Sequence, residues 1–260
     1  MLIFYLVLIT LLFAIIGYLF GNILFGDIFS FLLKKNVRAT GSGNVGGTNS
    51  IRAFGKRYGL CVMLLDGVKS YLSIVCCWCI YLFSIYRWFP NNHNFYSLIF
   101  VAGLFATIGH CFPIKFLIHI KDKDKFKLIG GKGMMTTGGM IAAISPYLAL
   151  VTLTIWIIVV LSSKYVSLSS MLCTLLSPFF VFVKQLDLLY LFGNSLFNNS
   201  LHFINEAPYL NHLFLFIGLF MIIFLSSLIV LYRHKSNIKN IISGNERKIF
   251  HNKHQISGNK

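Results

Sequence analysis

The chain has 260 residues, of which 57% are hydrophobic and only 12% charged, and its formal net charge at pH 7 is +16. Together with a mean hydropathy of +0.75, this composition excludes an ordinary soluble domain and predicts an integral membrane protein. The six cysteines lie within or at the ends of apolar segments, where they pack as small apolar residues, so neither a disulfide framework nor a zinc site is expected.

Apolar segments recur along the chain at lengths suited to a bilayer, which a helix crosses with roughly 17 to 25 mostly apolar residues. We expect about seven spanning helices, at residues 2–25, 59–83, 96–118, 134–144, 146–161, 166–183 and 213–232. Gly138, Gly139 and Pro146 leave open whether the fourth and fifth segments form one long kinked helix. The predicted fold class is all-α, a polytopic membrane helical bundle, because the segments are apolar throughout rather than alternating.

The first segment is expected to remain as a helix, because no basic residue precedes Lys34 and no small-residue cleavage site follows the apolar run. We expect residues 1–250 to form a single transmembrane domain and residues 251–260 a polar cytoplasmic tail. The segment 187–211, rich in Asn, Leu and Phe, carries no chemistry that its residues reveal.

The distribution of Lys and Arg predicts the orientation, because cytoplasmic loops carry an excess of positive residues. Six such residues follow the first segment, five follow the third and seven lie at and after the end of the last, whereas the opposite side holds only Arg87 and Lys184. With seven spans, the N-terminus lies outside and the C-terminus in the cytoplasm. Topology and anionic lipid therefore explain the positive charge, and no nucleic-acid motif accompanies it.

The loop after the first segment is rich in glycine and fixed charge, reading GSGNVGGTNSIRAFGKR over residues 41–57. Glycine lets backbone N–H groups approach an anion closely, and a helix N-terminus adds a favourable dipole. Arg52 adds a positive charge that can bind a phosphate through two nitrogens. The spacing of Gly41, Gly43 and Gly46 matches G-x-G-x-x-G, but no strand of a βαβ unit precedes it, so a nucleotide site is not indicated.

The second segment contains Asp66 and Lys69, three residues apart on one helical face. A charge at membrane depth costs about 2.5 to 3.5 kcal/mol even on insertion scales, so we expect both side chains to face the bundle and to pair. A structural support near the site, rather than catalysis, is the expected role.

Two more glycine-rich, basic clusters follow on the cytoplasmic side. GHCFP at residues 109–113 precedes LIGGKGMMTTGG at 128–139, and YRHKSNIKNIISGNERK covers 232–248. Three such clusters on one face predict phosphate recognition. GGKG is not a Walker motif, because Gly133 follows Lys132 where Ser or Thr is required. The alternative is that the glycines make tight turns and helix contacts while Lys and Arg follow the topology rule.

The segments GSGNVGGTNSIR, GHCFP with GGKG, KYVSLSS, and RHKSNI with GNERK resemble the bacterial acyl-phosphate:glycerol-3-phosphate acyltransferases, which are small seven-span enzymes. The resemblance implies transfer of a fatty acyl group from acyl phosphate to the 1-hydroxyl of glycerol 3-phosphate, giving lysophosphatidate and phosphate in phospholipid synthesis. It implies no cofactor and no metal. The expected partners are the two substrates, membrane lipid and the soluble enzyme that makes acyl phosphate. The expected location is the bacterial inner membrane, with the active site on its cytoplasmic face.

The resemblance also implies which residues form the site. Arg52, Lys132 and His234 are the expected catalytic residues. The expected substrate-binding residues are Ser42, Gly43, Asn44, Thr48, Asn49, Arg52, Gly130, Gly131, Lys132, Gly133, Ser167, His234 and Asn237. Glu246 matches a further family position. The base that accepts the hydroxyl proton is a substrate phosphate or His234, and His234 has the alternative role of binding phosphate or capping its helix.

Several residues depart from the family pattern. Gly47 stands where alanine is usual, and Met134 and Met135 follow Gly133 where valine and alanine are usual. Residues 119–128 form an insertion between the two halves of the second motif, which either lengthens a loop harmlessly or displaces Lys132. The insertion places His119 and Asp124 in an H-x-x-x-x-D spacing typical of an unrelated class of glycerolipid acyltransferases. We reject that assignment, because the partner PEG motif of that class is absent and the flanking Lys-Asp repeat reads as a solvated charge run.

Two other classes of function stay open at this point. A membrane carrier for phosphate or a small organic anion would place its polar residues at the bilayer midplane and show inverted repeats. The polar clusters here lie at one face and the chain shows no repeat, which favours the enzyme. A lipid-binding scaffold that recruits soluble partners would need no ordered pattern of Gly, Asn and Ser.

Overall fold

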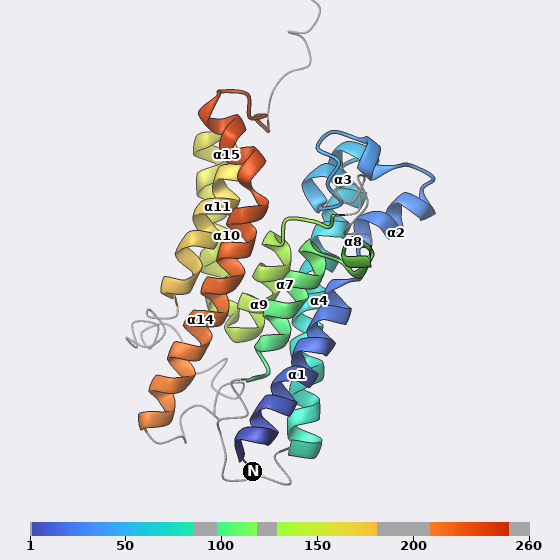
Figure 1. Ribbon diagram of the computed structural model, residues 1–260. Coiled ribbons are helices and arrows are strands. Elements are labelled where there is room, and N and C mark those ends of the chain that lie inside the picture. The colour runs from blue at the N-terminus through green and yellow to red at the C-terminus, as the bar shows by residue number, and fades with distance from the viewer. Residues whose placement is uncertain (1, 86–97, 119–128, 181–208, 250–260) are drawn as a thin grey trace, which may run out of the picture.

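The computed structural model describes residues 2–85, 98–118, 129–180 and 209–249. Within these ranges the regular structure is helical, and Figure 1 shows long helices side by side, with the short helices α2, α3 and α15 towards one end. The helices are α1 (Leu2–Gly21), α2 (Phe25–Leu32), η1 (Val37–Ala39), α3 (Gly47–Phe54), α4 (Lys56–Ile80), η2 (Tyr81–Ile85), α7 (Val101–Cys111), α8 (Ile114–Ile118), α9 (Met134–Ile144), α10 (Pro146–Ser163), α11 (Val166–Leu176), η4 (Ser177–Phe179), α14 (Tyr209–Arg233) and α15 (Lys235–Ile242).

The all-α membrane bundle predicted from the sequence is confirmed. Four helical stretches are long and apolar enough to cross a membrane: Ile3–Leu32, Lys56–Ile85, Pro146–Ser163 and Phe216–Arg233. Three shorter apolar helices, Val101–Cys111, Met134–Ile144 and Val166–Phe179, lie within the remaining three predicted segments. Large apolar side chains are exposed on the outer faces of these helices, as on α10 at Leu150, Ile158 and Leu161. Such surfaces are suited to lipid rather than water.

The fourth and fifth predicted segments are two helices, which settles the question that the sequence left open. Ser145 between them has an extended backbone, with φ −161° and ψ 118°, so the helical hydrogen bonding stops there. The Ser145 hydroxyl accepts a hydrogen bond from Leu148 N at 3.5 Å, and Pro146 takes the first position of α10, where its missing N–H costs nothing.

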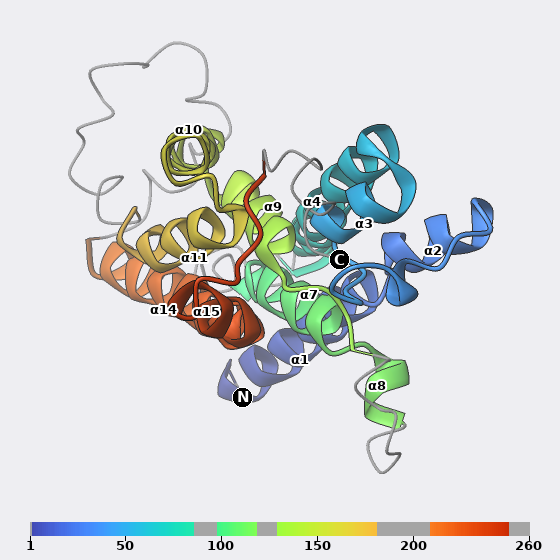
Figure 2. The same ribbon diagram turned by 90° about the horizontal axis from the view of Figure 1, so that it is seen from above.

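The helices α1 and α7 pack backbone against backbone through small residues (Figure 2). A Cβ on Gly17 would lie 2.1 Å from the Ala102 carbonyl oxygen, and one on Gly21 would lie 2.3 Å from that of Ala106. Small residues permit this close approach, which is the usual way for helices to associate in lipid. The main core, which includes the fully buried Phe13, lies between this pair and its neighbours α4, α9 and α14.

One end of the bundle collects all three glycine-rich, basic clusters. The helices α3 and α15, and the segment 129–133 that leads into α9, lie at the same end in Figure 1. The insertion at 119–128, with His119 and Asp124, lies outside the described residues, as do residues 187–208 and the predicted tail at 251–260.

Candidate active site

The loop that precedes α3 is folded around the side chain of Asn49, which is 3% exposed. Its amide nitrogen donates to the carbonyl oxygens of Val37, Thr40 and Asn44, each at 2.9 Å. Its oxygen accepts from Ser42 N at 3.1 Å. These four bonds use the side chain on backbone groups, so Asn49 shapes the loop instead of pointing its amide at a ligand.

Glycine is required at two positions of this loop by the backbone itself. Gly41 and Gly43 have φ values of +54° and +69°, which residues other than glycine rarely adopt. A Cβ on Gly41 would also lie 2.6 Å from the Asn49 side-chain oxygen and 3.2 Å from Cδ of Arg52. The Arg52 side chain therefore lies against the glycine turn. Beneath the loop, Leu24, Val37, Val45 and Phe54 form a small buried core.

The remaining predicted residues of the first motif lie around the start of α3. Ser42 is exposed, and Asn44 Oδ1 accepts a hydrogen bond from Gly46 N at 3.3 Å. Thr48 is half-buried in the first turn of α3, where backbone N–H groups lack partners within the helix and the helix dipole favours an anion.

Met63 of α4 occupies the space beside Gly47, where the family usually has alanine. A Cβ on Gly47 would lie 2.0 Å from Met63 Cγ and 3.2 Å from the Gly59 carbonyl oxygen. The larger Met63 side chain therefore fills the volume that a methyl group would take. The structure therefore has no room for an alanine at position 47 unless Met63 moves.

The second motif is an extended segment tied to the end of α7. Gly130 N donates to the Cys111 carbonyl oxygen at 3.1 Å, and Gly131 N donates to that of His110 at 3.0 Å. A Cβ on Gly130 would lie 1.8 Å from the His110 carbonyl oxygen, so a larger residue cannot replace it without moving the segment. Gly133 has φ +84° and starts α9. Lys132 is thereby placed just before a helix N-terminus.

A chain of polar contacts connects Lys132 to the third motif. Lys132 Nζ donates a short hydrogen bond to Asn237 Oδ1. Asn237 Nδ2 donates to Glu246 Oε1 at 2.8 Å, and Ser167 Oγ donates to the same oxygen at 2.6 Å. The Glu246 carboxylate therefore links four parts of the chain, directly or through Asn237. These are the segment before α9, α11, α15 and the stretch after α15. Backbone contact of Ile249 N with the Lys164 carbonyl, at 2.9 Å, fixes this stretch beside α11.

The electrostatics of the site favour an anion. Burial lowers the pKa of Lys132 to about 8, with the positive charges of Arg233 and Arg52 adding to the decrease and Glu246 opposing it. The pKa of Arg52 is also lowered, by partial burial and by Arg247, but a guanidinium remains protonated. Positive groups that lie this close together repel one another, and a bound anion would stabilise their charged forms.

His234 is buried and neutral. Its Nδ1 lies 2.8 Å from the Val230 carbonyl oxygen, which can only accept, so Nδ1 carries the proton and Nε2 has the free lone pair. Burial and the charge of Lys132 lower the pKa of His234 to about 4. At neutral pH the ring is therefore a weak base and a hydrogen-bond acceptor at Nε2.

The predicted Asp66–Lys69 pair is confirmed. The two side chains are 2% exposed, with Lys69 Nζ 3.0 Å from Asp66 Oδ1. Lys69 Nζ also donates to the Gly21 and Ile23 carbonyl oxygens, at 3.1 and 2.7 Å, and to His110 Nδ1 at 2.8 Å. The pair thus joins α4 to the end of α1 and to α7, directly behind the second motif.

The sequence-predicted residues therefore fall into three groups, of which one, Gly130, Gly131 and Gly133, forms the segment before α9 described above. Lys132 contacts Asn237 directly, Ser167 is linked to Asn237 through Glu246, and electrostatic interactions with Lys132 add Arg52 and His234. The residues of the first motif other than Arg52 shape the adjacent loop at the same end: Ser42, Gly43, Asn44, Thr48 and Asn49.

Sequence reasoning missed the polar residues that organise the site without belonging to its motifs. Arg38 and Arg233 were counted only as topology charges, and both contact the segment that carries Lys132. The available signal was Asp27, the first acidic residue of the chain, isolated in a basic loop. A single carboxylate among basic residues predicts an ion pair with a specific one of them. Among the residues that the structure describes, no three His, Cys, Asp or Glu side chains gather closely enough to hold a metal ion.

Comparison with known proteins gives one consistent result. Residues 11–244 match the model of the glycerol-3-phosphate acyltransferase family. The glycerol-3-phosphate acyltransferase of Malacoplasma penetrans is 35% identical, over 93% of this chain and 94% of that protein. The one of Mycoplasma pneumoniae is 35% identical, over 90% and 92%, and the one of Aquifex aeolicus is 32% identical, over 90% and 96%.

Two solved structures have a similar fold. Both are crystal structures of an integral membrane glycerol 3-phosphate acyltransferase, one in the glycerol 3-phosphate form and one in the lysophosphatidic acid form. Each has a TM-score of 0.63 and covers 92% of this chain and 94% of its own, with sequence identities of 29% and 27%.

Proposed function

Because the chain belongs to the glycerol-3-phosphate acyltransferase family, we propose that it transfers a fatty acyl group from acyl phosphate to the 1-hydroxyl of glycerol 3-phosphate. The products are lysophosphatidate and inorganic phosphate. The glycerol 3-phosphate and lysophosphatidic acid forms of the similar crystal structures support this acceptor and this product. The motif resemblance supports acyl phosphate as the donor.

The observation that carries the proposal is the network from Lys132 through Asn237 and Glu246 to Ser167, with Arg52 and the glycine turn beside it. Both proposed substrates carry a phosphate, and this end of the bundle offers the cations Lys132 and Arg52 and the N-terminal ends of α3 and α9. The apolar helices below provide surroundings in which an acyl chain is more stable than in water.

Positioning and charge are proposed to supply most of the catalysis. The glycerol 1-hydroxyl oxygen attacks the carbonyl carbon of the acyl phosphate and forms the ester bond. The bond from that carbon to the phosphate oxygen breaks, and phosphate leaves with the electron pair. Acyl phosphate is a mixed anhydride with a good leaving group, so Lys132 and Arg52 need only orient the substrates and stabilise developing negative charge.

The hydroxyl proton is proposed to pass to a substrate phosphate. The pKa of His234, at about 4, makes its ring a weak base at neutral pH. A phosphate has a second pKa of about 6 and is closer to the working pH. His234 then serves as an acceptor at Nε2, for a substrate hydroxyl or another donor, and as a member of the polar wall of the site.

The proposed location is the cytoplasmic side of the bacterial inner membrane. The excess of Lys and Arg at the end of the bundle that carries the site supports this orientation. A cytoplasmic site would receive soluble glycerol 3-phosphate directly, and would receive acyl phosphate from the soluble enzyme that makes it.

The deciding experiment is an assay of the purified protein in detergent micelles with labelled glycerol 3-phosphate. Palmitoyl phosphate, palmitoyl-CoA and no donor are offered in parallel, and lysophosphatidate is measured by thin-layer chromatography. We expect product with palmitoyl phosphate. Product only with palmitoyl-CoA would replace the donor assignment, and no product with either donor would refute the proposed activity.

A further inference from the structure

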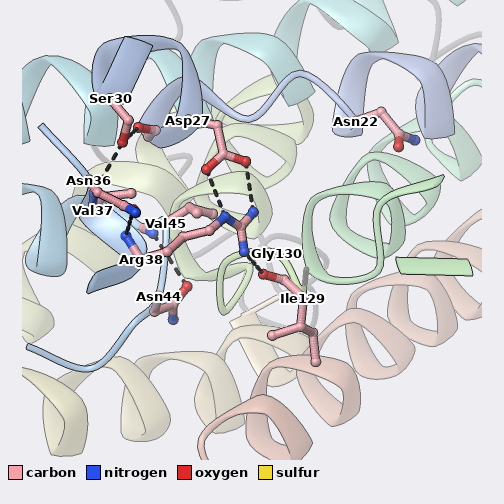
Figure 3. Close-up of polar contacts among 12 residues, drawn as sticks. Asn22, Asp27, Ser30, Asn36, Val37, Arg38, Asn44, Val45, Ile129 and Gly130 are labelled. Carbon is pink, nitrogen blue, oxygen red and sulfur yellow. Dashed lines mark hydrogen bonds and ion pairs between the residues drawn. The ribbon is translucent and has the colours of Figure 1, made fainter. Parts of the chain in front are cut away.

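Three consecutive carbonyl groups just before Lys132 each accept a hydrogen bond from an arginine. Arg38 Nη1 donates to the Ile129 oxygen at 2.8 Å (Figure 3). On the other side, Arg233 Nη2 donates to the Gly130 oxygen at 2.8 Å and Arg233 Nε donates to the Gly131 oxygen at 3.1 Å. The two arginines come from opposite parts of the chain, the loop before α3 and the end of α14.

The opposite edge of the same segment is also occupied. The N–H groups of Gly130 and Gly131 donate to the carbonyl oxygens at the end of α7. Bonds on both edges leave the backbone of residues 129–131 little freedom to shift or rotate. The position of Lys132, the next residue, follows from that of this segment.

Arg38 is itself held in a fixed orientation by Asp27 of α2. Its Nε and Nη2 atoms donate to the two carboxylate oxygens of Asp27, at 2.9 and 2.7 Å (Figure 3). The third guanidinium nitrogen, Nη1, is thereby aimed at the Ile129 oxygen. A lysine could satisfy the carboxylate or the carbonyl, but its single nitrogen has no planar fork that matches both.

Arg233 is held in a comparable way from the other half of the bundle. Its guanidinium carbon lies 5.8 Å from the centre of the Phe112 ring, a cation–π contact at the end of α7. It is adjacent to His234, so the same turn supplies both a contact to the segment and a wall of the site.

We propose that Asp27, Arg38 and Arg233 form a clamp that positions Lys132 for binding the phosphate of glycerol 3-phosphate. The inference rests on the proposed function, because it takes Lys132 as a substrate-binding residue. The three residues act through the backbone of 129–131 and are positioning residues. The clamp begins at Ile129, the first described residue after the insertion at 119–128.

A role in stability alone would have a different signature. The Arg38 and Asp27 side chains are 21% and 35% exposed and form a bidentate pair, so their loss can also lower stability, and the two effects must be measured separately. Loss of stability lowers the amount of active enzyme but leaves the KM of the remaining molecules unchanged. Loss of positioning raises KM in enzyme that stays folded.

The test compares Arg38→Met, Arg38→Lys and Asp27→Asn with a control, Lys35→Met, which removes one exposed positive charge from the same loop. The first measurement is hydrogen–deuterium exchange of the peptide that contains Gly130 and Gly131, in micelles and without substrate. We expect faster exchange in Arg38→Met, a smaller increase in Arg38→Lys and Asp27→Asn, and no change in the control. This measurement does not depend on activity.

The second measurement is the KM for glycerol 3-phosphate. We expect Arg38→Met to raise KM by about tenfold, as loss of a charge-assisted hydrogen bond commonly does, with partial rescue by Arg38→Lys. Unchanged exchange in all three variants would overturn the clamp. Faster exchange with unchanged KM would overturn its role in positioning Lys132. A wild-type protein that makes no lysophosphatidate would refute the proposed function, while the exchange result would still decide the clamp.

Discussion

Lys132 is the residue on which most of the proposed chemistry depends, and its surroundings make its amine lose a proton more readily. Burial and neighbouring cations lower its pKa to about 8, against an ordinary value of 10.5. The folded protein therefore holds this proton less tightly than the unfolded chain. Between about pH 8 and the ordinary value, rising pH favours the folded state at this residue, because the neutral amine suits its site better.

The pKa of Lys132 predicts the pH dependence of substrate capture. Only the protonated amine attracts a phosphate, so kcat/KM for glycerol 3-phosphate should fall as the pH rises above about 8. Lys132→Arg, whose side chain stays protonated, should move this fall to higher pH, and Lys132→Ala should lose nearly all activity. The measurement is the pH profile of kcat/KM for wild type and Lys132→Arg. The same descending limb in both enzymes would show that another group titrates.

Individual residues show which contacts a motif pattern predicts and which it does not. The motif pattern identified Lys132 and Asn237, which lie in contact. It also predicts Asn49 as a substrate-binding residue, and the structure shows this side chain bonded to the backbone of its own loop. A polar residue in a motif can bind a ligand or the chain itself, and only the three-dimensional positions of the carbonyl groups distinguish the two.

At the scale of elements, α9 packs so closely against α4 that one position of the contact has no room for a side chain. A Cβ on Gly139 would lie 2.0 Å from the Gly67 carbonyl oxygen, whereas one on Gly138 would meet no heavy atom within 4 Å. The two glycines are neighbours in one helix, so they differ only in the direction they face. The contact between the backbones of α4 and α9 depends on Gly139 alone of the two.

This difference predicts opposite effects of two adjacent alanine substitutions. Gly139→Ala should destabilise the bundle by about 1–3 kcal/mol, because α4 and α9 must move apart. Gly138→Ala should be neutral or stabilise by up to about 1 kcal/mol, since alanine is the better helix former. The measurement is the midpoint of unfolding in mixed micelles. Equal effects of the two substitutions would contradict the observed face of contact.

The boundaries of elements were predicted less well than their existence. The third predicted segment ran to residue 118, but the structure ends α7 at Cys111 and starts α8 at Ile114. Pro113 has no N–H and restricts the residue before it, which breaks the helix. The glycines and the proline between residues 138 and 146 do not predict the position of the helix break. The extended backbone of Ser145 shows that the helix breaks at this residue.

Across the whole molecule, the buried Asp66–Lys69 pair connects three helices. Lys69 bonds to the end of α1 and to His110 of α7, while Asp66 lies 3.5 Å from His110 Nδ1. Gly131 N, in turn, bonds to the His110 carbonyl oxygen. The pair therefore supports the site from behind without contacting the proposed substrates.

Removing either member of this pair should destabilise the bundle strongly. Asp66→Asn or Lys69→Met leaves one charge buried without its counterion, at a cost of about 3–5 kcal/mol. The double variant should be much less destabilised than the sum of the single variants, because neither charge remains. Denaturant unfolding in mixed micelles measures the three values. Additive losses would mean that the two side chains do not stabilise each other.

By itself, the sequence determined that this protein is an α-helical membrane bundle, and it determined the family. It also determined which residues place positive charge at one end of the bundle. These properties follow from local composition, because a membrane selects apolar helices and a motif preserves residue types at fixed spacing. Only the tertiary structure decided that Arg38 and Arg233 bond to the segment before Lys132, and that Glu246 joins Ser167 to Asn237. Contacts between residues about 80 to 100 positions apart depend on how helices pack, which spacing along the chain does not contain.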